Sequence, residues 1–539
     1  MAQTRKTLVS VLVDDVMNLG ALTYSIPAGM VCSAGDAVSV PFGKTSKHGL
    51  VIGPGVACKA AVKDILKVYG ARVSVTDLQA ATEIASAYYS SLAQVAQRLS
   101  PRSNRNSAPL DAGDLVVDGA LAKALPVCQT NWRERVILKA PLSSSAELAA
   151  AEAERLINKG QVLILCPSVS MVEAVLAQFA SGAARLDSKA RAGAWNGWRT
   201  GTVKVGIGTR SAALYSASKL DGIIVVDEEH PGHREACTPY THSRQVSQIR
   251  ARLHKCHLSY ISGSPSPQAM RGTKVLTVNS ATKLWPKATL IDRREVHPSM
   301  ASNPPLVHKI LGSGNLRNYV LTDSSESVLM CTRCKTLRPC TTCDTYCKHQ
   351  PKDACPTCAG KGVAWVGWGS QRLKALYTTC TPITVKDLDL LGGAPKRIVI
   401  PNFEGMFRRQ DINADQQNLS ILMRVTGAAG PKGEIIVLYS NSNNILLKSL
   451  VSRDTMPIVE QIWADAKQHD SPPFGYAVTI RSGQKNAPDT SLWPGVVYGP
   501  RKTSEGWETR VHCRESDYVT LKEILVSLKQ KGKTRIVVD

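Results

Sequence analysis

The chain has 539 residues, of which 43% are hydrophobic and 20% are charged, and this length supports several domains of roughly 150 residues each. Lysine and arginine outnumber aspartate and glutamate by 66 to 43, so the formal charge of +23 favours nucleic acid as a partner, with a basic surface kept for solubility as the alternative. Asp14 and Asp15 break the apolar N-terminal run, and no stretch is long and apolar enough to cross a bilayer. We therefore expect a soluble cytoplasmic protein without a signal peptide or a membrane partner.

The first part of the chain predicts a small all-β unit over residues 1–72. Short β-branched runs are broken there by turn residues, as in VCSAGDAVSVPFGKTSKHGLVIGPG. Residues 73–130 predict a helix and a linker. A capping box at Thr76 and Gln79 starts an apolar repeat of helical spacing that Pro101 stops, and a polar, turn-rich stretch follows.

Residues 131–290 predict a parallel α/β domain. Apolar runs of strand length, such as VLIL and GIIVV, alternate there with helical segments. After a connector over residues 291–330 and a cysteine-rich stretch, residues 361–450 predict a second, less regular α/β region through RIVIPNF and GEIIVLYS. Residues 451–539 end in a helix and the strand TRIVVD. The expected fold class is multidomain α/β.

A cluster of seven cysteines and one histidine predicts a zinc module over residues 331–360. The candidate ligands are Cys331, Cys334, Cys340, Cys343, Cys347, His349, Cys355 and Cys358. Each C-x2-C pair places two thiolates on one tight turn, and two such turns complete a closed tetrahedral site. Eight ligands predict two structural zinc ions per chain, held in a reducing compartment. The weakest ligand is His349, which as an exposed histidine would leave a three-cysteine site completed by another group.

The apolar run GIIVV ends in Asp227, Glu228, Glu229 and His230, a tetrad that resembles the DExH box of helicases. In a working motor the first carboxylate orients Mg²⁺ and the second polarises the attacking water, because phosphoryl transfer needs positioned charge.

The sequence around this tetrad resembles that of the PriA family of replication-restart helicases. The resemblance rests on VGIGTRSAALYSASKLDGIIVVDEEH, SYISGSPSPQAM and the zinc cluster, in that order and spacing. ALTYSIP, VPFGK and LKVYG resemble the family's domain for binding DNA 3′ ends, and SPPFGY and VVYGP resemble its C-terminal region. The match extends over most of the chain. It implies a small N-terminal β domain, two helicase-like lobes with an inserted zinc module, and a small C-terminal α+β domain.

The resemblance also implies an ATP·Mg²⁺ site, but the residues of the phosphate-binding loop depart from the family. This loop carries glycines and a Lys-Thr pair in the family and reads KAPLSSSAELAA here. Its degenerate positions are Ser143, Ser144, Ser145, Ala146 and Glu147. Ala146 stands at the lysine position and Glu147 at the Mg²⁺-binding hydroxyl. A carboxylate there repels phosphates, and the missing glycines remove the backbone freedom that a phosphate cradle requires.

Two further departures affect the same reaction. RVTGAAGP stands where the family has QVAGRAGR, so the two arginine positions fall at Ala428 and Pro431, and Ser264-Pro265-Ser266 replaces Ser-Ala-Thr. Each loss should lower the rate by orders of magnitude. We expect little or no ATPase and no unwinding, and we interpret Asp227 and Glu228 as strand-end residues with local contacts.

The family's 3′-end contacts are an aromatic residue, an aspartate and a lysine, which match Leu22, Thr23 and Lys67 in this chain. Only the lysine is retained. Tyr24, with Phe42 and Lys44, could supply stacking and a phosphate contact. A core role for the two aromatics is the alternative. The family's winged-helix module has no counterpart in residues 101–130, so phosphate contacts should dominate DNA binding.

These features predict a DNA-binding replication restart protein of the nucleoid that recognises abandoned or stalled forks and promotes primosome assembly and reloading of the replicative helicase. Its expected partners are forked or single-strand-containing DNA, primosome and helicase-loading proteins, and, as a further candidate, a single-stranded-DNA-binding protein. One alternative is an active ATP-dependent 3′-to-5′ helicase, and another is a zinc-ribbon nucleic-acid binder of an unrelated pathway.

Overall fold

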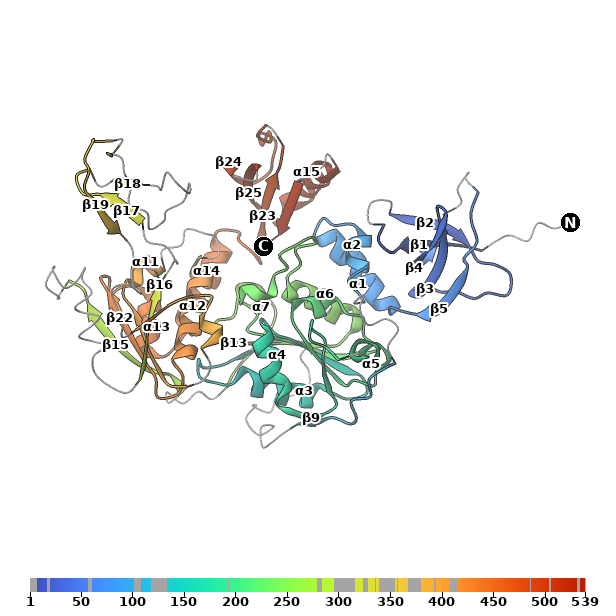
Figure 1. Cartoon of the computed structure of the whole chain (residues 1–539), viewed down its shortest axis with the longest axis horizontal. Coiled ribbons are helices and arrows are strands. Elements are labelled where there is room, and N and C mark those ends of the chain that lie inside the picture. Colours follow the sequence, from blue (N-terminus) through green and yellow to red (C-terminus); the bar gives the residue numbers. More distant parts are fainter. Residues whose placement is uncertain are drawn as a thin grey trace. The chain divides into compact units, whose positions relative to one another are not determined.

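The computed structural model describes most of the chain (Figure 1). The described residues are 7–16, 20–56, 61–100, 108–117, 133–191, 193–278, 284–294, 316–322, 328–334, 336–338, 354–355, 357–366, 380–391, 394–407, 414–484, 486–503, 506–530 and 534–538. They form two compact units. The first comprises Met1–Leu138, Ser144–Val278 and Trp463–Asp539, and the second Lys139–Ser143 and Asn279–Ile462. Within the described part of the chain, no helix combines the length and apolar character needed to span a membrane.

The N-terminal part of the first unit is an antiparallel sheet with the strand order β2-β1-β4-β3-β5. Its strands are β1 (Leu8–Val13), β2 (Ala21–Ser25), β3 (Asp36–Phe42), β4 (Thr45–Pro54) and β5 (Lys67–Ala71). The end strands approach each other because Ser25 bridges to Asp64 and accepts a hydrogen bond from Ile65 N at 2.9 Å. The sheet therefore curls toward a small barrel, whose interior is filled by valines and Tyr24.

Two short helices follow the sheet where the sequence predicted a single one. Helix α1 (Val75–Ala87) begins after Ser74, whose side chain accepts from Asp77 N, so Ser74 is the N-cap and the predicted cap at Thr76 is wrong. Tyr89 has a φ of +50°, which interrupts the helical backbone, and α2 (Leu92–Ala96) starts with its own capping box.

The central part of the first unit, called lobe 1 below, is a parallel sheet with the order β10-β11-β8-β12-β13-β7-β14. Its strands are β7 (Glu134–Leu138), β8 (Gln161–Leu165), β10 (Ala183–Arg185), β11 (Val205–Gly208), β12 (Leu220–Val226), β13 (His257–Ser262) and β14 (Lys274–Thr277). Its helices are α3 (Ser145–Leu156), α4 (Val169–Leu176), α5 (Ala194–Thr200), α6 (Ser243–His254) and α7 (Pro267–Met270), with 3-10 turns η2 (Arg210–Leu214) and η3 (Pro231–His233). The parallel α/β prediction is confirmed.

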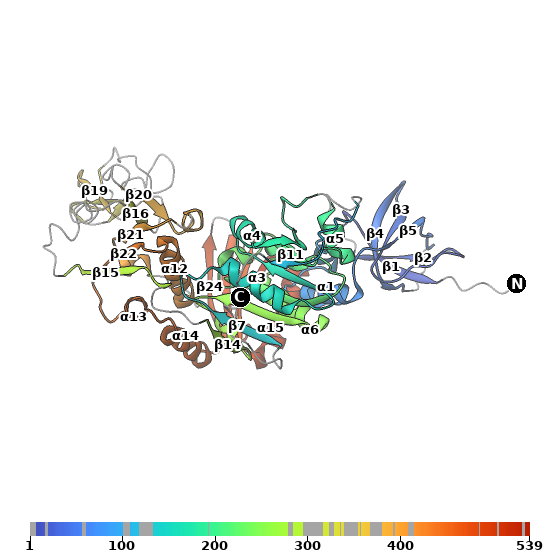
Figure 2. The same ribbon diagram turned by 90° about the horizontal axis from the view of Figure 1, so that it is seen from below.

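Alternate residues of β12 face opposite layers of helices. Ile224 and Val226 pack in the cluster with α3 and α4, whereas Ile223 and Val225 pack in the cluster with α1, α5 and α6. Figure 2 shows α3 and α4 on the side of the sheet opposite α6. All four side chains are 0% exposed, and burial of such a side chain contributes about 1.5–3 kcal/mol. A strand covered on both faces explains the continuous apolar run in the sequence.

The turn-rich stretch before lobe 1 lies against it over residues 108–117. Its Leu110 N donates to Gly193 O at 3.0 Å, and its Ala112 O accepts from Gly182 N at 2.7 Å. Strand β6 (Val116–Val117) then pairs with β9 (Phe179–Ser181). Both glycines have a φ of +80°, and a Cβ on Gly193 would lie 2.1 Å from Ala108 O, so the backbone can approach only glycine there.

The second unit is a parallel sheet with the order β15-β22-β21-β16-β20, together with a small antiparallel sheet in the order β18-β17-β19. The larger sheet contains β15 (Lys287–Asp292), β16 (Arg317–Thr322), β20 (Thr381–Thr384), β21 (Lys396–Ile400) and β22 (Glu434–Tyr439), and the smaller one β17 (Val328–Cys331), β18 (Leu337–Arg338) and β19 (Val363–Val366). The helical elements are η5 (Leu388–Leu390), α11 (Phe403–Met406), α12 (Ala414–Ala429), α13 (Ile445–Ser452) and α14 (Met456–Gln468), which continues into the first unit.

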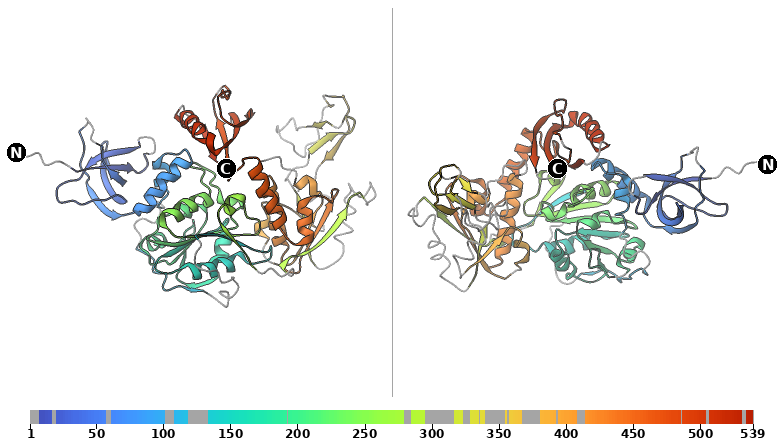
Figure 3. Two further views of the ribbon diagram at one scale, coloured as in Figure 1. Left: turned by 180° about the vertical axis from the view of Figure 1, so that it is seen from behind. Right: turned by 45° about the horizontal axis from the view of Figure 1, so that its top comes forward.

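The C-terminal residues form an antiparallel sheet in the order β24-β25-β23-β26, with a helix on one face (Figure 3, red). The elements are β23 (Gly475–Ser482), β24 (Val496–Thr503), β25 (Gly506–Arg514), η6 (Glu515–Asp517), α15 (Tyr518–Gln530) and β26 (Thr534–Val538). Leu521 and Leu525 of α15 pack on Val478, Ile480 and Val511 of the sheet. This part has the predicted order of a helix followed by a strand.

Candidate functional site

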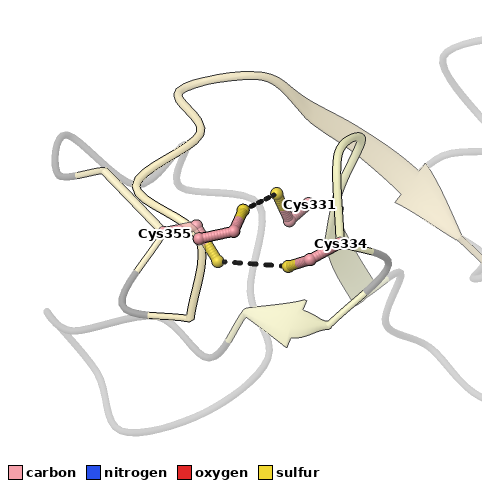
Figure 4. A group of neighbouring side chains, drawn as sticks. Cys331, Cys334 and Cys355 are labelled. Atoms are coloured by element: carbon pink, nitrogen blue, oxygen red, sulfur yellow. Dashed lines mark hydrogen bonds between the residues drawn. The ribbon is translucent and has the colours of Figure 1, made fainter.

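Four of the predicted metal ligands converge in the small sheet of the second unit. Cys331 and Cys334 lie where β17 turns toward β18, and Cys355 and Cys358 lie on the turn before β19. The four Sγ atoms all lie within 4.8 Å of one another. Figure 4 shows the side chains of Cys331, Cys334 and Cys355 pointing toward one another.

The spacing of the sulfurs fits a tetrahedral metal ion. The Sγ atoms of Cys331 and Cys358 are 3.6 Å apart, as are those of Cys334 and Cys355. Metal–sulfur bonds of about 2.3 Å in a tetrahedron place the sulfurs about 3.8 Å apart, whereas a disulfide joins them at about 2.05 Å. Cys331 and Cys355 are 0% and 2% exposed, whereas Cys334 and Cys358 are partly buried.

Backbone geometry holds the two turns in place. Cys331 N donates to Thr336 O at 3.0 Å, and Cys355 N donates to Gly360 O at 2.9 Å. These four cysteines can therefore hold one metal ion. The other predicted ligands, Cys340, Cys343, Cys347 and His349, lie outside the described residues.

The predicted DExH tetrad lies at the carboxyl end of β12, the edge of a parallel sheet where ligands usually bind. Asp227 has a φ of +48° and its backbone N donates to Ile261 O at 2.7 Å. Its carboxylate accepts from Ser145 Oγ, which lies 3.2 and 3.4 Å from the two oxygens. His230 Nδ1 accepts from Gly232 N at 2.9 Å and caps η3.

Glu228 is fully buried and bound to other side chains of lobe 1. Arg244 Nη1 lies 2.9 Å from Glu228 Oε2. Ser266 donates to the same carboxylate through its backbone N at 2.6 Å and through its Oγ at 3.0 Å. Ser266 belongs to the Ser-Pro-Ser segment that stands in place of the family's Ser-Ala-Thr. The position expected to polarise water is thus occupied by protein contacts.

Glu229 is partly buried beside two other carboxylates. Ser262 Oγ and Ser264 Oγ both donate to it at 2.8 Å. Burial, followed by the charges of Asp227 and Glu228, raises its pKa to about 8. Near pH 7 this carboxyl therefore keeps its proton, which reduces the negative charge at the strand end.

The degenerate phosphate loop leads from β7 into α3. Ser144 is the N-cap of α3, and its Oγ accepts from Glu147 N at 3.2 Å. A helix N-terminus binds phosphate through such N–H groups, so the cap engages a donor that a nucleotide would use. Ala146 is 6% exposed, and Glu147 is exposed in the first turn. Ser143, the remaining predicted position, precedes the cap.

The two arginine positions of the second lobe fall at the end of α12. Ala428 lies in the last turn of that helix and Pro431 in the turn after it. Neither residue offers a cation. The nearest arginine in sequence, Arg424, forms an ion pair with Asp389 at 2.9 Å.

The predicted DNA contacts of the N-terminal sheet separate into buried and exposed residues. Tyr24 is 4% exposed, and its hydroxyl donates to Pro41 O at 3.2 Å, which supports the core alternative for this residue. Lys44 is exposed in the turn between β3 and β4, and Lys67 is exposed at the start of β5. Leu22 and Thr23 lie on β2, at the other end of the strand order from Lys67.

Sequence comparison finds similarity to one group of proteins. The model of the PriA 3′ DNA-binding domain matches residues 10–101. The Replication restart protein PriA of Bacillus subtilis (strain 168) is 24% identical over 377 residues, covering 61% of this chain and 46% of the relative. That of Haemophilus influenzae is 20% identical over 423 residues, covering 64% and 57%. Over these stretches the chain is similar to PriA proteins, at low sequence identity. It spans about half the length of these two relatives.

Solved structures show weaker similarity. A RecG structure bound to a three-way DNA junction has a TM-score of 0.34 at 13% identity, covering 74% of this chain and 54% of that chain. The Dbp5 protein of S. cerevisiae bound to RNA and ADP BeF3 has a TM-score of 0.32 at 9% identity, covering 62% and 84%. TM-scores this low carry no argument about function.

Proposed function

We propose that this chain is a DNA-binding replication restart protein that recognises abandoned or stalled forks through its N-terminal sheet. The observation that carries the proposal is the match of residues 10–101 to a 3′ DNA-binding domain. This region coincides with the β1–β5 sheet and the two helices after it. The formal charge of +23 supports a polyanionic partner.

In this proposal the chain acts as a scaffold rather than as a motor. The side chain of Ser144 caps the helix that would receive a phosphate, and Arg244 and Ser266 bind Glu228. The loss of a cation at Ala428 and Pro431 acts in the same direction. ATP hydrolysis would require Ser144, Arg244 and Ser266 to leave their present hydrogen-bond partners.

The further steps of the proposal concern partners. We propose that the chain, bound at a fork in the cytoplasm, promotes assembly of the primosome and reloading of the replicative helicase. The support is the similarity of the chain to proteins named replication restart protein PriA. The cysteine cluster would hold Zn²⁺ and form a rigid docking module, because structural zinc supplies folding free energy to small domains.

The test is a fork-binding titration with the full chain at several salt concentrations. If phosphate contacts dominate, affinity should fall by about 10³-fold or more between roughly 50 and 200 mM salt, as expected for about six or more contacts. Lys67→Gln should weaken binding and reduce the salt slope by about one unit, whereas Lys189→Gln, which removes a lysine paired with Glu173 on lobe 1, should not.

Two results would contradict the proposal. A salt-independent affinity would exclude DNA as the physiological partner. Equal affinity for RNA hairpins and DNA forks would favour a nucleic-acid binder of another pathway.

A further inference from the structure

Glu235 lies in the loop that joins the DExH tetrad to α6, at the carboxyl edge of the parallel sheet of lobe 1. Only 7% of the residue is exposed. The two sides of the loop are held together, because Glu235 N donates to Thr241 O at 2.8 Å and Arg234 forms a β-bridge with His242. The backbone of the loop therefore fixes where the carboxylate begins.

Three donors from two other segments converge on this carboxylate. Arg210 Nε lies 3.3 Å from Glu235 Oε2, and Arg98 Nη1 lies 3.6 Å from Oε1. Ser211 Oγ donates to Oε1 at 3.1 Å. Arg210 and Ser211 are the first residues of η2, which follows β11, whereas Arg98 follows α2. Two guanidinium groups and one hydroxyl thus surround a single anionic group.

The carboxylate occupies this group of donors loosely. Arginine binds carboxylates and phosphates best through two parallel hydrogen bonds of about 2.7–2.9 Å. Here each arginine reaches Glu235 through one nitrogen, at a distance above that range. The side chains of Arg98 and Arg210 remain 28% and 37% exposed, so a polyanion can reach them. The buried pair of Arg244 and Glu228, by contrast, is 2.9 Å apart.

The alternative is a partly exposed ion-pair network that binds no ligand, and such networks are common on protein surfaces. Two observations favour an anion site. Two cations share one anion, so the group is positively charged, and it lies at the edge of a parallel sheet where ligands usually bind. A phosphate group offers arginine a bidentate partner, and the formal charge of +23 favours the backbone phosphates of DNA as its source.

We propose that Arg98, Arg210 and Ser211 form a site for a DNA backbone phosphate on lobe 1, and that Glu235 competes with the phosphate for this site. The inference rests on the proposed function and adds to it a contact that the chain itself occupies. Because the carboxylate must leave before a phosphate can bind, Glu235 lowers the affinity of the chain for DNA. Removal of its charge should make the site accessible.

The test is a fork-binding titration of the full chain at several salt concentrations. Glu235→Gln keeps an acceptor for Ser211 and removes the competing charge. It should tighten binding by about tenfold, the equivalent of one hydrogen bond to a charged group, and steepen the salt slope by about one unit. Glu173→Gln makes the same change in net charge, at a carboxylate that pairs with Arg185 and Lys189. This matched control should change the affinity by less than about twofold.

Two further variants locate the effect at the proposed site. Glu235→Asp keeps the net charge but shortens the side chain by one methylene group, so it should give a smaller gain in the same direction. It decides the question if Glu235→Gln does not fold, and the absence of any gain would then contradict the inference. The triple variant Arg98→Gln Arg210→Gln Glu235→Gln removes the two cations and should lose the gain.

The outcomes separate this inference from the proposed function. Equal gains in Glu235→Gln and Glu173→Gln, or a gain that persists in the triple variant, would show that the inference is wrong while fork binding stands. Binding of inorganic phosphate by Glu235→Gln without tighter fork binding would overturn the assignment to DNA. If neither the parent chain nor Glu235→Gln binds a fork, the proposed function fails together with the inference.

Discussion

Arg244 on α6 and Glu228 at the end of β12 form an ion pair inside lobe 1, with Nη1 2.9 Å from Oε2. The glutamate is 0% exposed and the arginine 9% exposed. Ser266 donates two further hydrogen bonds to the carboxylate, one to each oxygen. A buried charge arranged in this way is held in place by the surrounding structure.

Substitution of Arg244 by methionine should destabilise lobe 1. It leaves Glu228 buried without its counter-charge, and removing one partner of a buried pair costs about 3–5 kcal/mol. The double variant Arg244→Met Glu228→Gln should recover part of this loss, because it leaves no uncompensated charge. Urea denaturation gives the free energies of unfolding.

The matched control is Arg252→Met, on the same helix. Arg252 pairs with Glu83 at the surface, where the two side chains are 59% and 42% exposed. Exposed pairs contribute about 0–1 kcal/mol. Equal losses in Arg244→Met and Arg252→Met would contradict the role assigned to the buried pair.

Hydrolysis of ATP in the presence of forked DNA should not exceed that of the Asp227→Ala Glu228→Ala variant. The loop lacks the phosphate-binding lysine, and Ser145 and Arg244 already bind the two carboxylates. Phosphate release measured with both proteins at equal concentration is the test. A fork-stimulated rate in the parent chain that the double variant loses would establish the active-helicase alternative.

Cys355→Ser should remove one metal ion per chain. The four sulfurs are so close that each is needed to close the tetrahedron, and loss of one ligand opens it. Inductively coupled plasma mass spectrometry measures the metal content of the protein. Amide hydrogen exchange of β17 and β19 reports the local folding of the small sheet. Cys380→Ser, a free cysteine outside the cluster, should leave both quantities unchanged.

His349→Ala tests the second ion separately. If the parent chain binds two ions, this variant should retain the ion held by the cluster of Cys331, Cys334, Cys355 and Cys358. It should lose the second ion, for which His349 is a predicted ligand. A parent chain that contains one ion would show that the second site is not occupied.

The stability of lobe 1 should fall as pH rises toward 8 because of Glu229. Its folded pKa of about 8 lies above the ordinary value of about 4.3, so between these values the folded state holds a proton that the unfolded state has lost. The contribution of protonated Glu229 to the free energy of unfolding is therefore lost as the pH rises through this window. Glu229→Gln removes the titration; its amide oxygen can accept from one of the two serines, and its NH2 can donate to the hydroxyl of the other.

The measurement is the free energy of unfolding of both chains at pH 5.5, 7 and 8.5, which are experimental settings within and above that window. The stability of Glu229→Gln relative to the parent should increase with pH. Glu147→Gln, at an exposed carboxylate of α3, serves as the control. Parallel pH profiles for the parent and Glu229→Gln would contradict the raised pKa.

The elements that could be predicted best from the sequence are those whose burial is visible in a short run of consecutive residues. VLIL and GIIVV could be assigned to a parallel sheet because every residue of such strands is buried. Cys331, Cys334, Cys355 and Cys358 could be singled out as candidate ligands because each C-x2-C pair places two thiolates on one tight turn. The departure of the phosphate-loop residues from the family's pattern is visible in the sequence at Ala146 and Glu147, and its effect on nucleotide binding stays a prediction.

The features that the sequence did not reveal depend on contacts distant along the chain. Arg244 looks like an ordinary surface residue of an amphipathic helix, and its burial depends on Glu228 and Ser266, which lie on two other segments. The break at Tyr89 gave no signal either, because tyrosine does not favour a positive φ. The donors around Glu235 likewise come from segments distant along the chain.

Gly182 and Gly193, which form backbone hydrogen bonds with the segment 108–117, affect where a fragment of this chain can begin. A fragment that starts at the first strand of the parallel sheet would expose the carbonyl of Gly193 and the amide of Gly182, and it would leave β9 without its partner. Leu110 and Leu115 would no longer cover apolar side chains of the two core clusters. An isolated lobe intended for crystallisation or binding studies should therefore begin before Ala108.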